Sequence, residues 1–165
     1  MKIVVTDVSV FFDLFIIQAL PEFFELELEI CTTDFVYNEI EQSEQKETFD
    51  LFITKNKLKI LSFTEDEYSE VVNFKTKWSN RSLNDRTILW KALQLNSVLL
   101  TCDGKLKKEA EHHKIEVHGS LWVIEQLVLC KIITHAKGIE LLMALRKNNL
   151  RLPGKEIEKL IKQWK

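Results

Sequence analysis

Two aspartates stand beside short apolar segments of the kind that form buried strands. Asp7 comes directly after the β-branched segment 2–6. Asp103 follows the continuous apolar segment 97–101, with Cys102 between them. In a parallel sheet covered by helices, ligands bind at the edge formed by the carboxyl ends of the strands. The two carboxylates are therefore expected at the same edge of a sheet, in a position to act on a bound molecule.

Two more acidic residues are predicted to approach this edge from neighbouring helices. Asp85 lies in the first turn of a helix that Ser82 can cap, and Glu39 lies a turn or two into the helix that follows a strand at 28–32. Each acid alone also fits a structural role, as a helix cap, a turn residue or a solvated side chain. Their joint placement predicts a cluster of four carboxylates.

Such a cluster implies a bound cation, because like charges within a few ångströms raise one another's pKa unless a cation compensates them. Oxygen ligands without Cys or His suit Mg²⁺ or Mn²⁺, which share their remaining positions with water and phosphate oxygens. This chemistry supports hydrolysis of a phosphodiester by an activated water.

Cys102, beside Asp103, is expected to face the core as a small apolar residue rather than to act as a nucleophile.

The apolar pattern predicts strands that alternate with helices, as in a three-layer α/β/α sandwich with a central, mainly parallel sheet. The predicted strands are 2–6, 28–32, 58–62, 97–101 and 115–117. The predicted helices are 8–20, one from 33 past 40, one ending near 55, 64–78, 82–95, 105–113, 119–133, 136–148 and 154–164. We predict a domain at 1–135 and a C-terminal helical extension at 136–165 packed on the same domain.

Composition excludes several classes of protein. The four glycines of this 165-residue chain cannot form either of the common glycine-rich phosphate loops. Three cysteines without a C-x-x-C pair argue against a disulfide framework or zinc site and favour a reducing cytoplasm, and no stretch resembles a signal peptide or membrane span.

The net charge of −2 is unevenly distributed: 21–50 holds ten acids and one lysine, whereas 75–91 holds five bases and one acid. The basic segment either forms a solvated face or meets a polyanion.

Five short motifs occur along the chain in the order typical of the PIN-domain family, the small metal-dependent nucleases that include the VapC-type toxins. They are Asp7-Val8-Ser9 after the first strand, the V-x-x-E of 36–39, the helix-opening acid of 82–85, the L-L-T-x-D of 99–103 and the G-[ST]-L of 119–121. The tail at about 139–160 also resembles the helical extension of an uncharacterised PIN subgroup. The sequence therefore resembles a PIN-domain protein over most of its length.

The resemblance implies a metal-dependent endoribonuclease, a hydrolase that cuts RNA phosphodiester bonds using Mg²⁺ or Mn²⁺. It implies that the catalytic, metal-binding acids are Asp7, Glu39, Asp85 and Asp103. Ser9 and Thr101 would supply hydroxyls that support these ligands or touch phosphate. Four bases lie within a few residues of a proposed ligand and are candidate phosphate contacts, namely Arg81, Arg86, Lys105 and Lys107.

Partners and alternatives follow from the same features. The enzyme could be the toxin of a type II toxin–antitoxin pair, and the apolar faces of the two C-terminal helices either pack on the domain or dock an antitoxin helix or a second copy in a homodimer. The alternative function is a non-catalytic PIN-like module that binds RNA or protein. A phosphotransferase of the haloacid dehalogenase type ranks last, because Ser9 stands where that type requires a second aspartate.

Overall fold

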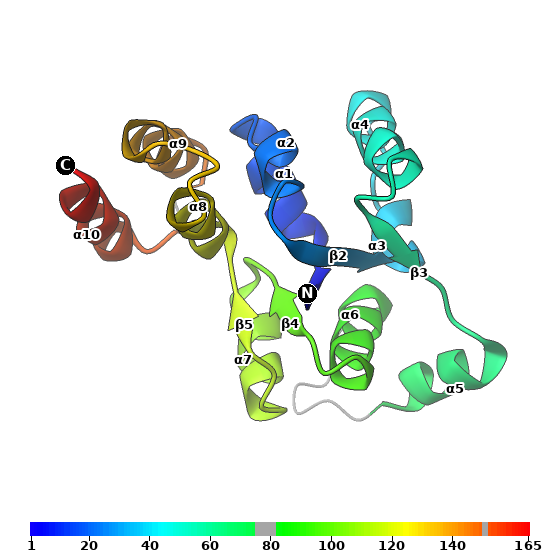
Figure 1. Ribbon diagram of the computed structural model, residues 1–165. Helices are drawn as coiled ribbons and strands as arrows, with labels where there is room; N and C mark the ends of the chain where they lie inside the picture. Colours follow the sequence, from blue (N-terminus) through cyan, green and yellow to red (C-terminus); the bar gives the residue numbers. More distant parts are fainter. Residues whose placement is uncertain (75–81, 150–151) are drawn as a thin grey trace.

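The computed structural model describes residues 1–74, 82–149 and 152–165. In these residues five strands form one sheet in which every pairing is parallel, in the order β3-β2-β1-β4-β5 (Figure 1). The strands are β1 (Lys2–Thr6), β2 (Leu28–Thr33), β3 (Lys59–Leu61), β4 (Val98–Leu100) and β5 (Val117–His118). The predicted α/β class with a parallel central sheet is confirmed.

Alternation of side chains along the strands divides the core into two apolar clusters. Val4 and Ile30 belong to one cluster, whereas their neighbours Val5 and Cys31 belong to the other. Strands buried on both faces in this way require helices on both sides of the sheet. The continuous apolar runs in the sequence follow from this double burial.

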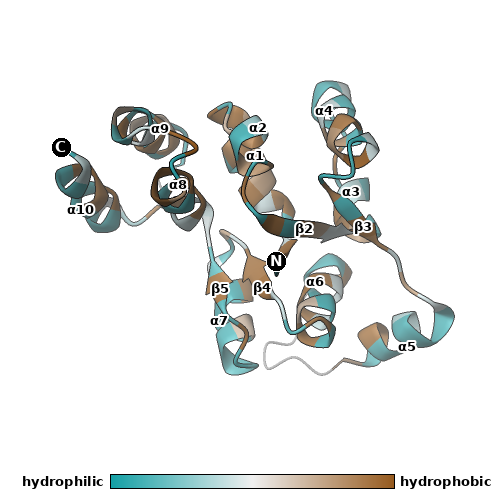
Figure 2. Ribbon diagram, viewed as in Figure 1, coloured by the Kyte–Doolittle hydropathy of each residue, from teal (hydrophilic) through white to brown (hydrophobic). Residues whose placement is uncertain are grey.

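The helices form the two outer layers (Figure 1). One face is covered by α1 (Val8–Ile16), α2 (Leu20–Phe23), α4 (Ser43–Thr54), α8 (Ser120–Leu129), α9 (His135–Asn148) and α10 (Gly154–Trp164). The other face is covered by α3 (Asp34–Asn38), α6 (Leu83–Gln94) and α7 (Gly104–His112), and α5 (Glu65–Asn73) packs on α6. Hydrophobic colouring dominates α1, α2 and α8 in Figure 2, as expected for helices buried between neighbours. No helix in the described part of the chain is both long and apolar enough to cross a bilayer.

Several helices begin at side-chain caps, among them the Ser82 cap that the sequence indicates. Thr64 accepts a hydrogen bond from the backbone N–H of Glu67, whose carboxylate accepts from the N–H of Thr64, which completes a capping box. Ser82 caps α6 by accepting from the N–H of Asp85. The helix predicted to reach residue 78 ends earlier, at Asn73, because Phe74 takes an extended conformation; residues 75–81 lie outside the described residues.

Three other predicted helices also end earlier than their patterns indicate. The helix predicted from 33 past 40 ends at Asn38. The remaining two end just before residues in a left-handed conformation. The helix predicted at 8–20 ends at Ile16, and Gln18 then adopts a left-handed conformation with φ of 56°. The helix predicted at 119–133 ends at Leu129 in the same way, with Lys131 at φ of 59°. In both, backbone N–H groups fold back on carbonyls of the last turn, so the apolar residues beyond belong to the helix cap.

The last strand is also displaced from its prediction at 115–117. Lys114 takes a left-handed conformation with φ of 60°, and the N–H of Ile115 donates to the carbonyl of Ala110. Ile115 therefore closes α7, and strand pairing begins only at Val117.

The C-terminal helices share the main apolar cluster with the sheet. Leu142 of α9 and Ile157 of α10 are fully buried in the cluster that contains Val4 of β1. Gly138 lies where α8, α9 and α10 meet, and a Cβ atom there would stand 2.7 Å from Val128 and 2.9 Å from the ring of Trp164. The predicted boundary between residues 135 and 136 falls within the first turn of α9.

The Gly138→Ala variant is expected to lower the free energy of unfolding by about 1–3 kcal/mol, because the added methyl group forces Trp164 or Val128 to shift. Urea denaturation followed by circular dichroism measures this change. Gly104→Ala is the matched control, because a Cβ atom there meets nothing within 4 Å. Equal stability of the Gly138→Ala variant and the parent would contradict the close packing of α10 on α9.

Candidate functional site

The parallel pairing of β1 and β4 brings the ends of the two strands together. Thr6 stands opposite Leu100, and the N–H of Asp7 donates to the carbonyl of Leu100 at 2.8 Å. Asp7 precedes α1, and Asp103 precedes α7 as its N-cap. Both acids therefore lie at the carboxyl edge of the sheet, where the sequence predicts them.

The Asp7 carboxylate is buried and held by two hydroxyl groups. Asp7 is 7 % exposed. Its Oδ2 accepts hydrogen bonds from Ser9 Oγ at 2.5 Å and from Thr101 Oγ1 at 2.9 Å. Neither of these donors engages Oδ1. The hydroxyls fix the rotamer of the carboxylate and offset part of the cost of burying it.

The same two hydroxyls join Asp7 to the segment that carries Asp103. Ser9 Oγ accepts from the N–H of Cys102 at 3.0 Å, and Thr101 Oγ1 accepts from the N–H of Asp103 at 3.0 Å. Asp103 Oδ1 in turn accepts from the N–H groups of Lys105 and Leu106 at the start of α7. The two aspartates are thus fixed within one hydrogen-bonded network.

Glu39 reaches this region from the C-terminal end of α3, where it is exposed. Partial loss of contact with water is the largest cause of a raised Glu39 pKa; a hydrogen bond with Asn84 opposes it, and the charges of Asp7 and Asp85 add to it. Mutual repulsion of this kind requires the three carboxylates to lie near one another. The structure therefore brings Glu39, Asp7 and Asp85 to a common region.

The acids are close without forming a preassembled metal cage. Across the described residues, no three Asp, Glu, His or Cys side chains are grouped tightly enough to hold a metal ion as they stand. The donors are hard carboxylate oxygens, which match Mg²⁺ or Mn²⁺ in chemistry. The repulsion that raises the Glu39 pKa is also what a cation would relieve.

The predicted basic contacts have different surroundings. Arg86 donates through Nη1 to the carbonyl of Val72 at 3.1 Å and so ties α6 to the end of α5. Lys105 and Lys107 are exposed on α7, close to Asp103 in the chain. Arg81 lies outside the described residues.

A second polar network, which the sequence interpretation missed, lies beside the acids. Asp13 of α1 is 9 % exposed, and its Oδ2 accepts from Ser120 Oγ at 2.8 Å and from the Cys102 thiol at 3.3 Å. The amide nitrogen of Asn149 donates to both oxygens of Asp13, at 3.2 and 3.4 Å. The available signal was one acidic residue within the otherwise apolar stretch 8–20.

A cavity of about 270 Å³ lies between the two networks. It is lined by Ser9, Asp13, Cys102, Asp103, Asn149 and Leu152. Its lining includes residues of the acidic site and of the C-terminal segment. The extension therefore helps to bound the space beside the candidate catalytic acids.

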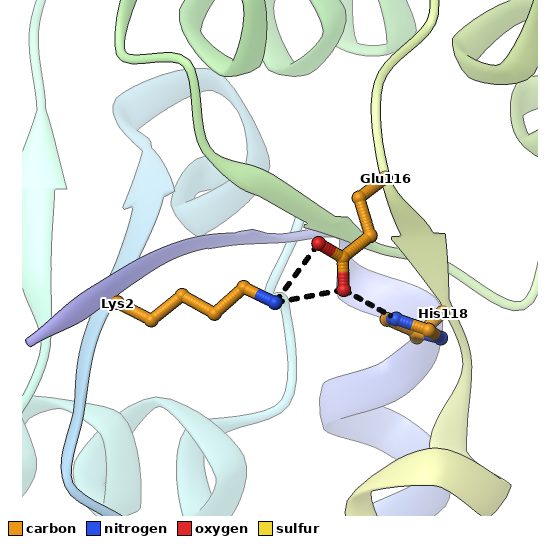
Figure 3. A network of polar contacts seen from close by, with 3 residues as sticks. All are labelled: Lys2, Glu116 and His118. Carbon is orange, nitrogen blue, oxygen red and sulfur yellow. Dashed lines mark hydrogen bonds and ion pairs between the residues drawn. The ribbon is translucent and has the colours of Figure 1, made fainter.

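His118, near the edge strand, has neighbours that hold it in place. Glu116 accepts from Lys2 Nζ at 2.7 and 2.9 Å and pairs with His118 Nε2 at 2.8 Å (Figure 3). The His118 ring also stacks on Trp122, with centroids 4.6 Å apart. Hydrogen bonding to Lys2 and then to His118 lowers the Glu116 pKa. These contacts tie β1 to β5 and give His118 a structural role.

Comparison with known proteins agrees with this architecture. A PilT N-terminus domain protein from the hyperthermophilic archaeon Sulfolobus solfataricus P2 has a similar fold, with a TM-score of 0.51 and 10 % identity over 77 % of this chain and 94 % of that one. No curated protein matches the chain. The family model DUF3368, described as a PIN domain, matches residues 3–165. Together with the parallel sheet and the acids at its carboxyl edge, this match shows that the chain belongs to the PIN-domain family.

Proposed function

We propose that the protein is a metal-dependent endoribonuclease that hydrolyses RNA phosphodiester bonds with Mg²⁺ or Mn²⁺. The observation that carries this proposal is the gathering of acids at the carboxyl edge of the sheet, where Ser9 and Thr101 fix the buried Asp7 carboxylate and its charge reaches Glu39. PIN domains are commonly nucleases that use divalent metals, which gives the coupling a chemical purpose. Coupled carboxylates are costly in a fold unless a cation uses them.

The residues divide the work of hydrolysis. Asp7, Glu39, Asp85 and Asp103 would hold the metal, which when bound lowers the pKa of the attacking water and offsets the charge on the phosphate. Ser9 and Thr101 keep the Asp7 carboxylate in one orientation. In the reaction, the oxygen of water bonds to phosphorus, one P–O ester bond breaks, and the leaving ribose oxygen takes a proton. Lys105 and Lys107, which are exposed on α7, would contact the flanking phosphates.

The biological setting is part of the proposal. A cytoplasmic toxin of a type II toxin–antitoxin pair would act on cellular RNA and be restrained by a partner protein. The exposed apolar residues Leu129 and Met143, at 61 % and 60 % exposure, offer contact area on α8 and α9 for an antitoxin or a second copy of the chain.

One observation favours a second candidate, a module that binds RNA or protein without turnover. In the part of the chain that the structure describes, the acids do not stand as a finished metal cage. The acidic segment 21–50 also opposes tight binding of a polyanion. The experiment that follows separates the two functions.

Pure protein is expected to cleave a mixed RNA pool when Mn²⁺ or Mg²⁺ is added and to stop when the metal is chelated. Asp7→Asn and Asp103→Asn are each expected to lower the cleavage rate by roughly 100-fold or more, because each removes a ligand charge. Asparagine still accepts hydrogen bonds and caps helices as well as aspartate, so both variants are expected to fold. Gel electrophoresis of the RNA measures the cleavage rate, and thermal denaturation measures whether each variant is folded.

Glu111→Gln is the control for charge, because Glu111 is exposed in the last turn of α7, away from Asp103. Its cleavage rate is expected to equal that of the parent. Retained cleavage in both aspartate variants would overturn the catalytic assignment. Metal-independent RNA binding with no cleavage in either metal would establish the binding module instead.

Metal binding is expected to depend on the protonation of Glu39. A ligand must lose its proton to bind a cation, so the raised Glu39 pKa makes Mn²⁺ affinity increase with pH beyond the ordinary range of a glutamate. Asn84→Ala removes the hydrogen bond that lowers this pKa, so the pKa is expected to rise further. The pH midpoint of Mn²⁺ binding should then shift upward, as measured by calorimetric titrations across a pH series.

A carbon-detected NMR titration of the metal-free protein assigns the shift to Glu39 itself. Asn148→Ala is the matched control, because among the described residues the Asn148 side chain bonds within α9, to the carbonyl of Ala144. An unchanged or lowered midpoint in Asn84→Ala would show that Glu39 does not bind the metal.

A further inference from the structure

The Asp13 network, defined as Asp13, Cys102, Ser120 and Asn149, connects three distant parts of the chain. Asp13 comes from α1, Cys102 from the end of β4, and Ser120 from the first turn of α8. Asn149 is the residue at the C-terminal end of α9, and its own N–H donates to the carbonyl of Leu145 at 2.8 Å. The amide side chain of Asn149 thus connects the extension to the candidate catalytic edge.

Cys102 is the member that joins this network to the acids. Its thiol lies 3.3 Å from Asp13 Oδ2 and 3.0 Å from Ser120 Oγ, while its backbone N–H donates to Ser9 Oγ. Burial raises the pKa of the Cys102 thiol to about 12, so the thiol keeps its proton and can donate. Residue 102 is therefore held from one side by Asp13 and from the other by Ser9, which binds Asp7.

Burying the Asp13 network costs free energy that an apolar core would not. Asp13 is a buried carboxylate whose hydrogen bonds in the described residues come from neutral donors, and apolar side chains of similar volume stabilise a core at least as well. Asp13 also lines the cavity that Ser9 and Asp103 line. A polar group retained at such a cost beside a reactive centre serves the geometry of that centre.

We propose that Asp13 and Asn149 are positioning residues, through which the C-terminal extension fixes the segment 101–103 and thereby the orientation of Asp7 and Asp103. The inference rests on the proposed nuclease function. Asn149 holds Asp13, Asp13 holds Cys102 and Ser120, and the Cys102 backbone holds Ser9 against Asp7. Groups that orient metal ligands in this way typically change affinity or activity by 10–100-fold when they are removed.

The test uses the full chain and two variants of the network. Asn149→Ala removes the donor, and Asp13→Asn leaves only one acceptor oxygen for three donors. Each variant is expected to bind Mn²⁺ about 10-fold more weakly and to lose about 10-fold in kcat on RNA, with KM for RNA little changed. Asn149→Gln, which keeps an amide donor, is expected to recover part of both losses.

Glu158→Gln is the matched control on the extension. It breaks the exposed ion pair between Glu158 and Arg146, at 3.4 Å, without touching the Asp13 network. Its Mn²⁺ affinity and kcat are expected to equal those of the parent. Equal losses in Glu158→Gln would mean that any loosening of the extension is sufficient, which overturns the specific role of Asn149.

Thermal denaturation separates positioning from stability. If Asn149→Ala lowers the melting temperature but leaves Mn²⁺ affinity and kcat unchanged, the network is structural and the inference is wrong. That result differs from failure of the proposed function, in which the folded parent itself neither binds Mn²⁺ nor cleaves RNA. In the latter case both proposals fall together.

Discussion

The structure depends on the hydrogen bonds that hold the buried carboxylate of Asp7. A buried charge is costly unless donors surround it, and the two donors come from Ser9, two residues away, and Thr101, 94 residues away. The second donor is available only because β1 and β4 pair in parallel, with Thr6 opposite Leu100. The sheet order and the acidic edge are therefore consequences of one arrangement.

Helix termini make this edge tolerant of negative charge. The helices α1, α6 and α7 begin beside Asp7, Asp85 and Asp103, and Asp103 accepts directly from two backbone N–H groups. The positive ends of helix dipoles favour carboxylates at these positions. Glu39, at the C-terminal end of α3, lacks this support, and burial together with the charges of Asp7 and Asp85 raises its pKa. A cation is the natural complement to that remaining repulsion.

The sequence predicts the features that depend on neighbouring residues. The capping box at Thr64, the cap at Ser82 and the acids beside apolar strands each depend on a few consecutive residues, and the structure contains all of them. Early helix ends such as that at Gln18 were missed, because a non-glycine residue in a left-handed conformation leaves little trace in an apolar pattern. The contact between Asp13 and Asn149 spans 136 residues, so no local rule could find it.

Two buried acids, Asp7 at the N-cap of α1 and Asp13 within that helix, hold the segment that follows β4. Asp7 binds the Thr101 hydroxyl, and Asp13 binds the Cys102 thiol, so consecutive residues of one segment are held by different carboxylates. Within the described residues, neutral donors make these contacts, and no cationic side chain pairs with either acid. A segment fixed in this way presents Asp103 without depending on the ion that the site would bind. The fold thus supplies the geometry, and the unbalanced charge supplies the attraction for a cation.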